Sequence, residues 1–557
     1  MRLAVREVRL ITLLIVGLSR LALSGAVAAQ APGNDRGTII IVVGAEATTP
    51  VPTLSSFQAN VDVAELLFLR LARPGKGART RNENEFVPEL ARSWKRRDPL
   101  TLAFDLDPRA TWQDGVPVTS RDVVWSLNRA RDSTIAPDYA LLLHQVASVS
   151  AEGDRRVVIR FKRAYPEQFY DATWHVPPLP AHLVDTIPAA DLAKSAWAAA
   201  PVGSGPYRFV RRDPGHQIEL AAVSNFFLGA PKLERVILVL AGDAEAQLNL
   251  VLSGEADGLQ NYLLLSSISR IVAAPSLRIV TSASHNVVYL LFNQRANGDR
   301  STPHPILSNL LVRRAIALAI DRERIVTGIF GPYAVVINGP FGSASWVRPF
   351  APKLPRADPS AARRLLRQAG WTDTDGDGVV DRDGRPLTLQ LQYPGSNVPR
   401  VAVAAVIQEM LRGIGVKLEL VRLEGRVWAE RRAKGQFDID FGQTTLDPTP
   451  SGLVQSWTCA GRLGSNRGQW CNPTFDSLLE RAINTPTEPA KAWGDAIRVL
   501  QNDVPAVFLF SPMLSVVLQD RYRNVTVSPE RTWGLLWQWS VDPKRRIGRD
   551  DGSGPPR

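Results

Sequence analysis

From residue 359 onward, segments typical of helices alternate with segments typical of strands. In order, they are helix Pro359–Ala369, strand Leu387–Tyr393, helix Val401–Leu411, strand Val416–Leu423, helix Arg426–Lys434 and strand Phe437–Phe441. Gly370 follows the first helix, at the position where a glycine ends many helices. Strands that are joined through helices by short loops predict an α/β domain whose strands are at least partly parallel.

The chain before residue 359 contains further candidate strands and helices. Thr38–Val43 is a continuous β-branched run, which predicts a strand buried on both faces. Strands are also expected over Leu100–Leu106 and Arg156–Phe161, and helices over Ser120–Ala130, with Thr119 as N-cap, and over Asn309–Val326. The last helix has a predicted core stripe of Leu311, Ala315, Leu318, Ala319 and Arg322. At about 100–200 residues per domain, 557 residues predict two to four domains.

The N-terminus has the layout of an export signal. Arg2, Arg6 and Arg9 precede an apolar run over Leu10–Leu18, and small residues follow around Ala28. This layout predicts a secretory signal peptide over residues 1–28 and an exported mature protein. The alternative is an uncleaved anchor, although the apolar run is well short of the ~20 residues that a membrane span needs. No later stretch is long and apolar enough to be a span.

Two cysteines occur in the chain, and twelve positions separate Cys459 from Cys471. In an oxidising compartment, a pair this close is expected to form a disulfide. The alternative is two free or catalytic thiols. A catalytic cysteine needs a setting that lowers its pKa, and no histidine lies close to either residue in the sequence.

Charge and motifs exclude several classes of function. The chain has 66 Lys and Arg against 54 Asp and Glu, but the cations are scattered and form no basic helix with interleaved aromatics, so we expect no nucleic-acid partner. Attraction to anionic ligands or surfaces stays open. No metalloprotease, nucleophile-elbow, S-x-x-K or phosphate-loop motif occurs. These absences favour a binding protein over an enzyme; an exported hydrolase is the rival interpretation, and the sequence nominates no residue for it.

One acidic segment resembles the start of a calcium loop. Asp373, Asp375 and Asp377 occupy positions 1, 3 and 5 of a D-x-D-x-D-G pattern, and Asp381 occupies position 9. Position 12 is Gly384, so the bidentate glutamate of an EF-hand is missing. We expect either a structural Ca²⁺ ion or a turn closed by aspartate and glycine. No other cofactor is expected.

Several motifs together resemble one known family. They occur in this order: Phe86–Trp94 (P-x-L-A-x-S-W), Trp112–Val124 (W-x-D-G-x-P-V-T-x-x-D-V), Pro201–Tyr207 (P-V-G-x-G-P-Y), Ser253–Asp257 (S-G-E-x-D), Leu291–Asn293, Val312–Asp321 and Ala369–Trp371. The ordered set runs over about residues 38–540 and is similar to the dipeptide, oligopeptide and nickel class, family 5, of ABC-transporter solute-binding proteins. Most of these residues are expected to be structural.

The resemblance implies a two-lobed α/β clamshell of the cluster C type with an extra inserted domain. Lobe I would contain residues 29–60, 201–285 and 515–545, the inserted domain 61–200, and lobe II 286–514. The polar tail 546–557 is expected to be disordered. Ligand would bind between the lobes, which would close by a hinge motion.

The resemblance also nominates ligand contacts. Peptide binders of the family carry an aspartate, which pairs with the peptide ammonium, in the loop after the strand equivalent to Phe437–Phe441. Here the corresponding position is Thr444, and Asp447 is the carboxylate that could substitute for it. The candidate contacts are Thr48, Phe57, Trp346, Gln443, Thr444, Thr445 and Asp447. The alternative for each is a plain connecting role, because loops often only connect.

We therefore expect a monomeric periplasmic protein that performs no chemistry. It would deliver a peptide-like or other small polar solute to the permease and ATPase subunits of an ABC importer without spanning the membrane itself. A binding protein that serves as a sensor or chaperone, without a transporter, is the second interpretation.

Overall fold

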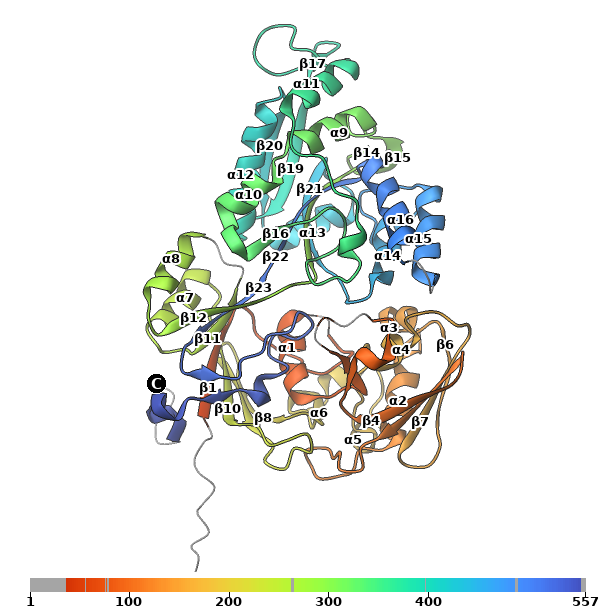
Figure 1. Cartoon of the computed structure of the whole chain (residues 1–557), viewed down its shortest axis with the longest axis vertical. Helices are drawn as coiled ribbons and strands as arrows, with labels where there is room; N and C mark the ends of the chain where they lie inside the picture. The colour runs from red at the N-terminus through yellow and green to blue at the C-terminus, as the bar shows by residue number, and fades with distance from the viewer. Residues whose placement is uncertain are drawn as a thin grey trace, which may run out of the picture. The chain divides into compact units, whose positions relative to one another are not determined.

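The computed structural model describes residues 37–551, except for residues 56, 76, 78, 79, 262–264, 396 and 486–488. The predicted signal peptide over residues 1–28 lies outside the described residues. Most of the described chain is organised around three larger sheets, which Figure 1 shows.

The first sheet has seven strands, in the order β12-β23-β11-β1-β10-β9-β8. Its strand β1 (Gly37–Val43) runs parallel to both of its neighbours. The other strands are β8 (Tyr207–Asp213), β9 (Gln217–Ala222), β10 (Leu233–Leu240), β11 (Gly258–Asn261), β12 (Leu277–Ser282) and β23 (Leu514–Gln519). Ile39 and Ile41 are buried in one apolar cluster and Val42 in another. The predicted strand buried on both faces is therefore confirmed.

The second sheet has six strands, in the order β16-β22-β13-β21-β19-β20. They are β13 (Asn286–Phe292), β16 (Ala334–Val336), β19 (Thr388–Pro394), β20 (Lys417–Leu423), β21 (Ile439–Thr445) and β22 (Ala506–Pro512). Helices α12 (Val398–Arg412) and α13 (Gly425–Ala433) connect β19, β20 and β21, and β19 is parallel to β20 and β21. The predicted alternation is confirmed. β21 extends further than predicted because β13 pairs with it as far as Thr445.

The helix expected over Asn309–Val326 is interrupted. Helix α9 (Leu310–Ala319) ends at Ile320, whose backbone is extended, and the Asp321 side chain then caps the short helix α10 (Arg322–Ile325). The buried face of α9 contains Val312, Arg313, Ala315, Ile316 and Ala319, so only the two alanines of the predicted stripe are buried. A single long helix is therefore wrong, because Asp321 starts a second one by accepting a hydrogen bond from the Arg324 main-chain N–H at 2.9 Å.

The third sheet is antiparallel, in the order β4-β5-β7-β6. Its strands are β4 (Ala91–Asp98), β5 (Thr101–Leu106), β6 (Val146–Ala151) and β7 (Arg156–Phe161). Helix α2 (Ser120–Ala130) lies in the same segment of the chain. Thr119 is at the N-cap, as the sequence predicts, and the structure adds that it forms a capping box with Asp122.

The remaining elements are short strands and helices around these sheets. The strands are β2 (Ala72–Pro74), β3 (Phe86–Pro88), β14 (Arg295–Ala296), β15 (Asp299–Pro303), β17 (Asp381–Arg382), β18 (Arg385–Pro386), β24 (Tyr522–Arg523) and β25 (Ser540–Val541). The helices are α1 (Gln58–Leu67), α3 (Pro137–Leu142), α4 (Gln168–Thr173), α5 (Ala181–Val184), α6 (Ala196–Ala199), α7 (Ala244–Leu252), α8 (Leu265–Ala273), α11 (Pro359–Gln368), α14 (Leu453–Trp457), α15 (Pro473–Asn484) and α16 (Pro489–Asp503).

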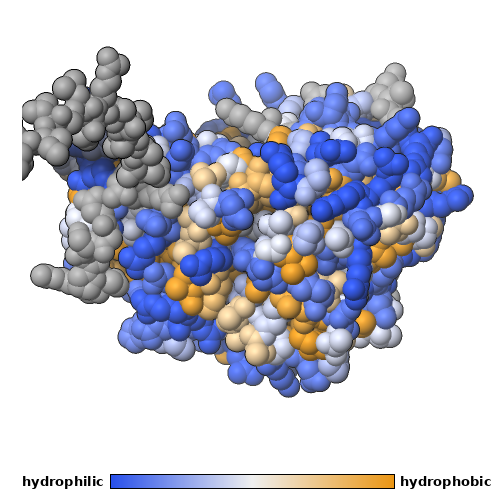
Figure 2. All heavy atoms as spheres, turned by 90° about the horizontal axis from the view of Figure 1, so that it is seen from below, coloured by the Kyte–Doolittle hydropathy of each residue, from blue (hydrophilic) through white to orange (hydrophobic). Residues whose placement is uncertain are grey.

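Among the described helices, none combines the length and apolar character that a bilayer crossing requires. Figure 2 shows apolar residues interspersed with hydrophilic ones over one face.

The chain passes twice between the seven-stranded and six-stranded sheets, from β12 to β13 and from β22 to β23. Three serines hold these crossings together. The Ser284 and Ser511 hydroxyls are buried and 3.3 Å apart. The Ser284 main-chain N–H donates to Ser343 Oγ at 2.9 Å, and the Ser343 main-chain N–H donates to Ser511 Oγ at 2.9 Å.

The expected disorder of residues 546–557 is wrong for residues 546–551, which dock on β1; residues 552–557 lie outside the described part. The buried Asp550 carboxylate accepts from the Thr38 main-chain N–H at 3.1 Å and from Arg521 Nη1 at 2.6 Å. Arg521 also pairs with the buried Asp257 at 3.0 Å. A buried carboxylate with two such partners ties the tail to the sheet, which composition alone did not reveal.

A second buried ionic cluster joins the C-terminal segment to α1 and to Glu89, the residue after β3. Arg531 is 4% exposed. It donates to Glu89 at 2.8 Å and lies 3.7 Å from Glu65. The guanidinium groups of Arg531 and Arg70 both lie near the Trp174 ring, at 5.4 and 4.2 Å from its centroid. These side chains are buried, and their opposite charges lie next to one another, as buried charges require.

Candidate ligand-binding site

The end of β21 and the loop after it line a cavity of about 330 Å³. Four of the expected contacts, Gln443, Thr444, Thr445 and Asp447, all lie in its wall. Thr445 Oγ1 and Gln443 Nε2 donate to Asn286 Oδ1, at 2.8 and 3.3 Å. Because Asn286 lies opposite Thr445 in the β13–β21 ladder, strand pairing fixes the positions of these polar side chains.

Two arginines line the same cavity, and one of them is held from behind. Arg432 of α13 has Nε 2.8 Å from Asp440 Oδ2 and donates from Nη2 to the Tyr289 hydroxyl at 3.1 Å. Asp440 is fully buried and also accepts from Trp428 Nε1 at 2.8 Å. Arg467, the second arginine, makes no ion pair with the described residues, and burial together with the nearby Arg432 lowers its pKa. This wall therefore presents fixed positive charge.

A second cavity, of about 460 Å³, adjoins the first. The two share Asp447, Gly452 and Gln455 in their walls. Its remaining walls come from α14, α15 and neighbouring loops, and from residues 141–175 beside the four-stranded sheet. The cavities meet at Asp447, an exposed side chain that faces both.

Glu167 is the most deeply buried carboxyl of this second cavity. It is 5% exposed, and Thr80 Oγ1 donates to its Oε1 at 2.7 Å. Its other oxygen has no hydrogen-bond partner among the described residues. Burial raises the pKa of Glu167 from 4.5 to about 8, with smaller contributions in the same direction from Asp171 and Asp447. The hydrogen bond from Thr80 and the charge of Arg81 act in the opposite direction, and burial outweighs them in disfavouring the charged form of Glu167.

Asp171 of α4 is oriented by two neighbours in the same wall. The Tyr165 hydroxyl donates to its Oδ2 at 2.6 Å, and His175 Nε2 lies 3.1 Å from its Oδ1. Burial lowers the pKa of His175, but the hydrogen bond and charge of Asp171 outweigh burial, so the pKa of His175 is raised. This pair gives the cavity a second, hydrogen-bonded carboxylate.

Phe57, another expected contact, lies elsewhere. It lines a cavity of about 370 Å³ at the ends of β1, β9 and β10, which is walled mainly by apolar side chains. Asp62 lies in the same wall, and burial raises its pKa to about 6. Phe57 is 52% exposed at this site. The structure therefore does not bring Phe57 into the cavities that contain Asp447.

Thr48 and Trp346 line none of these three cavities. The carbonyl oxygen of Thr48 accepts from Arg212 Nη1 at 3.0 Å. Trp346 contacts Phe350 and Trp493 edge to face, and the Arg81 guanidinium lies 5.7 Å from its ring centroid. Both residues remain predictions as ligand contacts.

Comparison with known proteins places the chain in a family. Residues 85–464, more than half of the chain, match the model of bacterial extracellular solute-binding proteins, family 5. The chain belongs to this family. Oligopeptide-binding protein AppA of Bacillus subtilis is 24% identical over 87% of this chain and 88% of its own length. Peptide transport periplasmic protein SapA of Salmonella typhimurium is 25% identical over 80% of this chain and 82% of its own.

Solved structures agree with this assignment. AppA in complex with a nonapeptide superposes with a TM-score of 0.75 at 23% identity, over 91% of this chain and 99% of that chain. NikZ from Campylobacter jejuni in complex with Ni(L-His) superposes with a TM-score of 0.76 at 25% identity, over 91% and 99%. This family member thus has the expected α/β fold of the cluster C periplasmic binding proteins.

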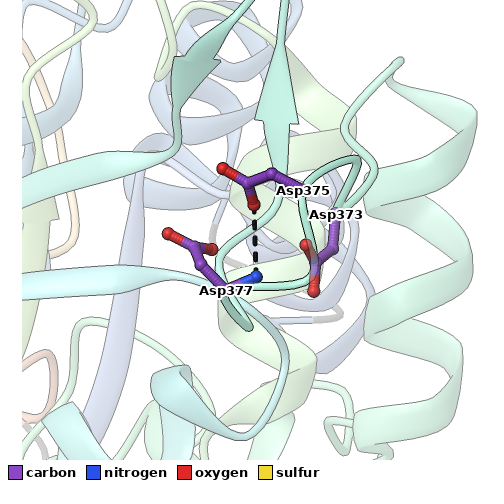
Figure 3. A group of neighbouring side chains, drawn as sticks. All are labelled: Asp373, Asp375 and Asp377. Carbon is purple, nitrogen blue, oxygen red and sulfur yellow. Dashed lines mark hydrogen bonds between the residues drawn. The ribbon is translucent and has the colours of Figure 1, made fainter.

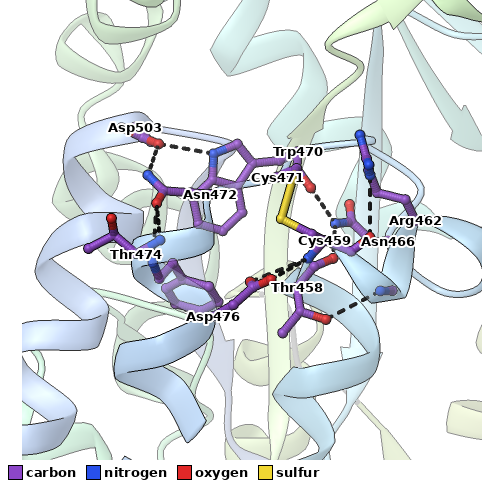
Figure 4. Close-up of a disulfide and its surroundings, with 12 residues drawn as sticks. Thr458, Cys459, Arg462, Asn466, Trp470, Cys471, Asn472, Thr474, Asp476 and Asp503 are labelled. Atoms are coloured by element: carbon purple, nitrogen blue, oxygen red, sulfur yellow. Dashed lines mark hydrogen bonds between the residues drawn. A yellow bond between two sulfur atoms is a disulfide. The ribbon is translucent and has the colours of Figure 1, made fainter. Parts of the chain in front are cut away.

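The disulfide lies beside the candidate site in this family member. Cys459 and Cys471 are bonded, so the chain's two cysteines leave no free thiol (Figure 4). The Cys459 main-chain N–H donates to Asp476, whose carboxylate also lines the second cavity. Asn472 caps α15 next to the bond. The bond therefore closes the segment that carries Arg467.

The aspartate loop, defined as Asp373–Asp381, brings three of its four expected ligands together. Oxygens of Asp373, Asp375 and Asp377 lie within 4.8 Å of one another, and all three side chains are exposed (Figure 3). Each accepts a main-chain N–H inside the loop. Asp381 instead accepts from Thr374 Oγ1 at 2.7 Å. The loop is therefore closed by its own hydrogen bonds, and calcium remains a prediction.

Sequence reasoning missed the residues that face Asp447 across the second cavity. Glu167 follows Pro166 in a segment without a motif, and Asp171 lies on a six-residue helix. Their position depends on contacts between segments almost 300 residues apart, so no local pattern could have indicated them. Arg432 and Arg467 were missed for the same reason. The one available signal was the high charge density of the helix Arg426–Lys434.

Proposed function

We propose that this protein is the periplasmic substrate-binding component of an ABC importer, and that it captures a peptide-like or other small polar solute. The observation that carries the proposal is the pair of adjoining cavities around Asp447, lined by arginines on one side and carboxyls on the other. Charged groups of both signs around a concave site suit a small zwitterionic solute. The names of AppA and SapA, which refer to oligopeptides and to peptide transport, support this class of ligand.

The proposal includes the lobes and their motion. Lobe I would contain residues 29–60, 201–285 and 515–545, lobe II residues 286–514, and the inserted domain residues 61–200. The two crossings held by the serines support a hinge at residues 283–285 and 512–514. Ligand contacts made to both sides of the cavities would shift the population toward the closed form. The protein would perform no chemistry and would dock on its permease as a monomer.

A thermal-shift screen followed by calorimetry tests this function. The panel contains di- to pentapeptides, opines, sugars and metal chelates, the last because NikZ was solved with Ni(L-His). A ligand at about 100 times its Kd stabilises the folded state by about 2.7 kcal/mol. Lack of stabilisation by every compound in the panel would refute the proposal. Cleavage of a peptide during the assay would favour the hydrolase interpretation instead.

Export and partnership need separate tests. N-terminal sequencing of the protein recovered from the periplasm is expected to show cleavage near residue 28. Uptake of a labelled ligand into vesicles is expected to require this protein together with a permease and ATPases. Ligand binding without any dependent uptake would favour the sensor or chaperone interpretation.

A further inference from the structure

We propose that a cationic group of the ligand docks between Glu167 and Asp447, and that its docking displaces the proton of Glu167 into solvent. This inference rests on the proposed function, because it assumes that a solute occupies the cavities around Asp447. It adds the chemical class of the group that the second cavity accepts and a proton balance for binding.

The geometry around Glu167 is that of an incomplete site. One carboxyl oxygen is satisfied by Thr80, which is itself fully buried. The other oxygen belongs to a side chain that is 95% buried by area, lines the cavity and has no hydrogen-bond partner among the described residues. Buried polar atoms are normally paired, so an unpaired oxygen in a cavity wall indicates a partner supplied from outside the chain.

Carboxyl groups surround this oxygen from both sides of the cavity. Asp171 belongs to the same wall as Glu167, whereas Asp447, Asp476 and Glu480 belong to the opposite one. Asp171 and Asp447 both act on Glu167 in the direction that disfavours its charged form. The phenols of Tyr165 and Tyr170 stay neutral, because burial raises their pKa values.

The described cationic side chains near Glu167 hydrogen-bond to other groups, although the charge of Arg81 lowers the pKa of Glu167 against the larger effect of burial. Arg163 donates to Asn484 at 3.1 Å, and Arg81 donates to the Thr485 carbonyl oxygen. Two histidines also line the cavity: His175 bonds Asp171, and His144 has its Nδ1 2.7 Å from the Leu141 carbonyl oxygen. None of these groups makes a hydrogen bond or ion pair with Glu167.

A cation placed between Glu167 and Asp447 favours the charged form of Glu167 and so lowers its pKa. An opposite charge within about 4–6 Å typically lowers a carboxyl pKa by 1–3 units. Starting from about 8, such a shift brings the pKa of Glu167 to between about 5 and 7. The O–H bond of Glu167 then breaks, the proton goes to buffer, and the carboxylate that remains pairs with the ligand cation. A neutral ligand group would instead accept a hydrogen bond from protonated Glu167 and release nothing.

Calorimetry with three peptides tests the inference. The probes are trialanine, N-acetyl-trialanine, and N-acetyl-Ala-Arg-Ala, which carry a terminal cation, no cation and a side-chain cation. Titrations at about pH 6.5, where the peptide ammonium is already charged, are run in two buffers that differ in ionisation enthalpy. We expect roughly 0.2–0.9 proton to be released per cationic peptide bound, which is what a lowering by 1–3 units from about 8 gives at this pH. We expect no release with N-acetyl-trialanine, and about tenfold or more weaker binding of that peptide.

Two matched variants assign the proton. Glu167→Gln is expected to abolish proton release and to reduce the preference for cationic peptides to less than about twofold. Glu255→Gln removes an exposed carboxylate that lines none of the three cavities and is expected to leave proton release intact. Peptides that bind without releasing a proton, or that bind Glu167→Gln with unchanged selectivity, overturn this inference and leave the proposed function standing. Failure of all three peptides to bind overturns the peptide-like ligand itself, and this inference with it.

Discussion

Glu167→Gln is expected to make the ligand-free protein more stable, and to do so only at neutral and alkaline pH. The pKa of Glu167 in the folded state is about 8, against an ordinary value of 4.5. A raised folded-state pKa contributes stability below the unfolded-state value, and that stability is lost as pH rises through 8. A difference of about 3.5 pKa units corresponds to ~5 kcal/mol at about 1.4 kcal/mol per unit. This value is the upper limit for the change in the free energy of unfolding.

Glutamine has nearly the shape of glutamic acid and can keep the hydrogen bond from Thr80, but it does not ionise. The variant should therefore match the parent protein at about pH 5 and exceed its free energy of unfolding by several kcal/mol at about pH 9. Urea unfolding followed by tryptophan fluorescence, at several pH values without ligand, measures this difference. Other titrating groups are common to both proteins and cancel.

The control is Glu255→Gln, because that carboxylate is exposed and lines none of the cavities, so its replacement is not expected to reproduce the gain in stability at alkaline pH. The reasoning would be refuted by a Glu167→Gln difference that is the same at pH 5 and pH 9. It would also be refuted by destabilisation at alkaline pH. Either result would mean that Glu167 is already ionised in the folded, ligand-free protein.

The other predictions concern stability and metal binding. Arg531→Met should cost ~3–5 kcal/mol in urea unfolding, because it leaves buried carboxylates without their cation; a loss below about 1 kcal/mol would contradict the buried cluster. Replacing both Cys459 and Cys471 with serine should cost about 3 kcal/mol, the loop-closure value for this spacing, and unchanged unfolding would argue against the bond. Asp550→Ala should cost ~1–3 kcal/mol, since a main-chain N–H of β1 loses its acceptor; an unaffected unfolding curve would mean that the tail is not docked. Calcium should bind the aspartate loop with a Kd of about 1 mM or weaker, because the bidentate glutamate is missing; at about 10 mM Ca²⁺ this stabilises by no more than ~1.4 kcal/mol, and micromolar affinity would contradict it.

The sequence predicts correctly those elements whose signals come from residues that lie close together in the chain. The α2 capping box needs only Thr119 and Asp122, three residues apart, and the sequence placed that helix with the bounds that the structure has. The ends of β21 were misplaced because its length depends on pairing with β13, about 150 residues earlier in the chain. The long helix through Ile320 was wrong because apolar periodicity continues across a break that an aspartate cap creates.

The candidate site shows the same division between local and long-range information. The contacts expected in one loop, from Gln443 to Asp447, do share a cavity, because neighbours in sequence stay neighbours in space. Phe57 lines a different cavity, whereas Thr48 and Trp346 line none of the three and stay predictions as ligand contacts. Glu167 was not expected at all, since its importance arises from burial opposite Asp447, which sequence periodicity does not encode.

The position of β23 in the seven-stranded sheet has a consequence for the order in which the protein can fold. Both β11 and β12 pair with β23, whose residues 514–519 follow β12 by more than 230 residues in the chain, and the Asp550 contact to β1 comes later still. The six-stranded sheet, by contrast, takes all its strands from the single stretch 286–512. A growing or translocating chain can therefore complete its second sheet before its first. The seven-stranded sheet stays open at β11 until β23 has been made, so β12 can join the sheet only after the whole six-stranded sheet is available.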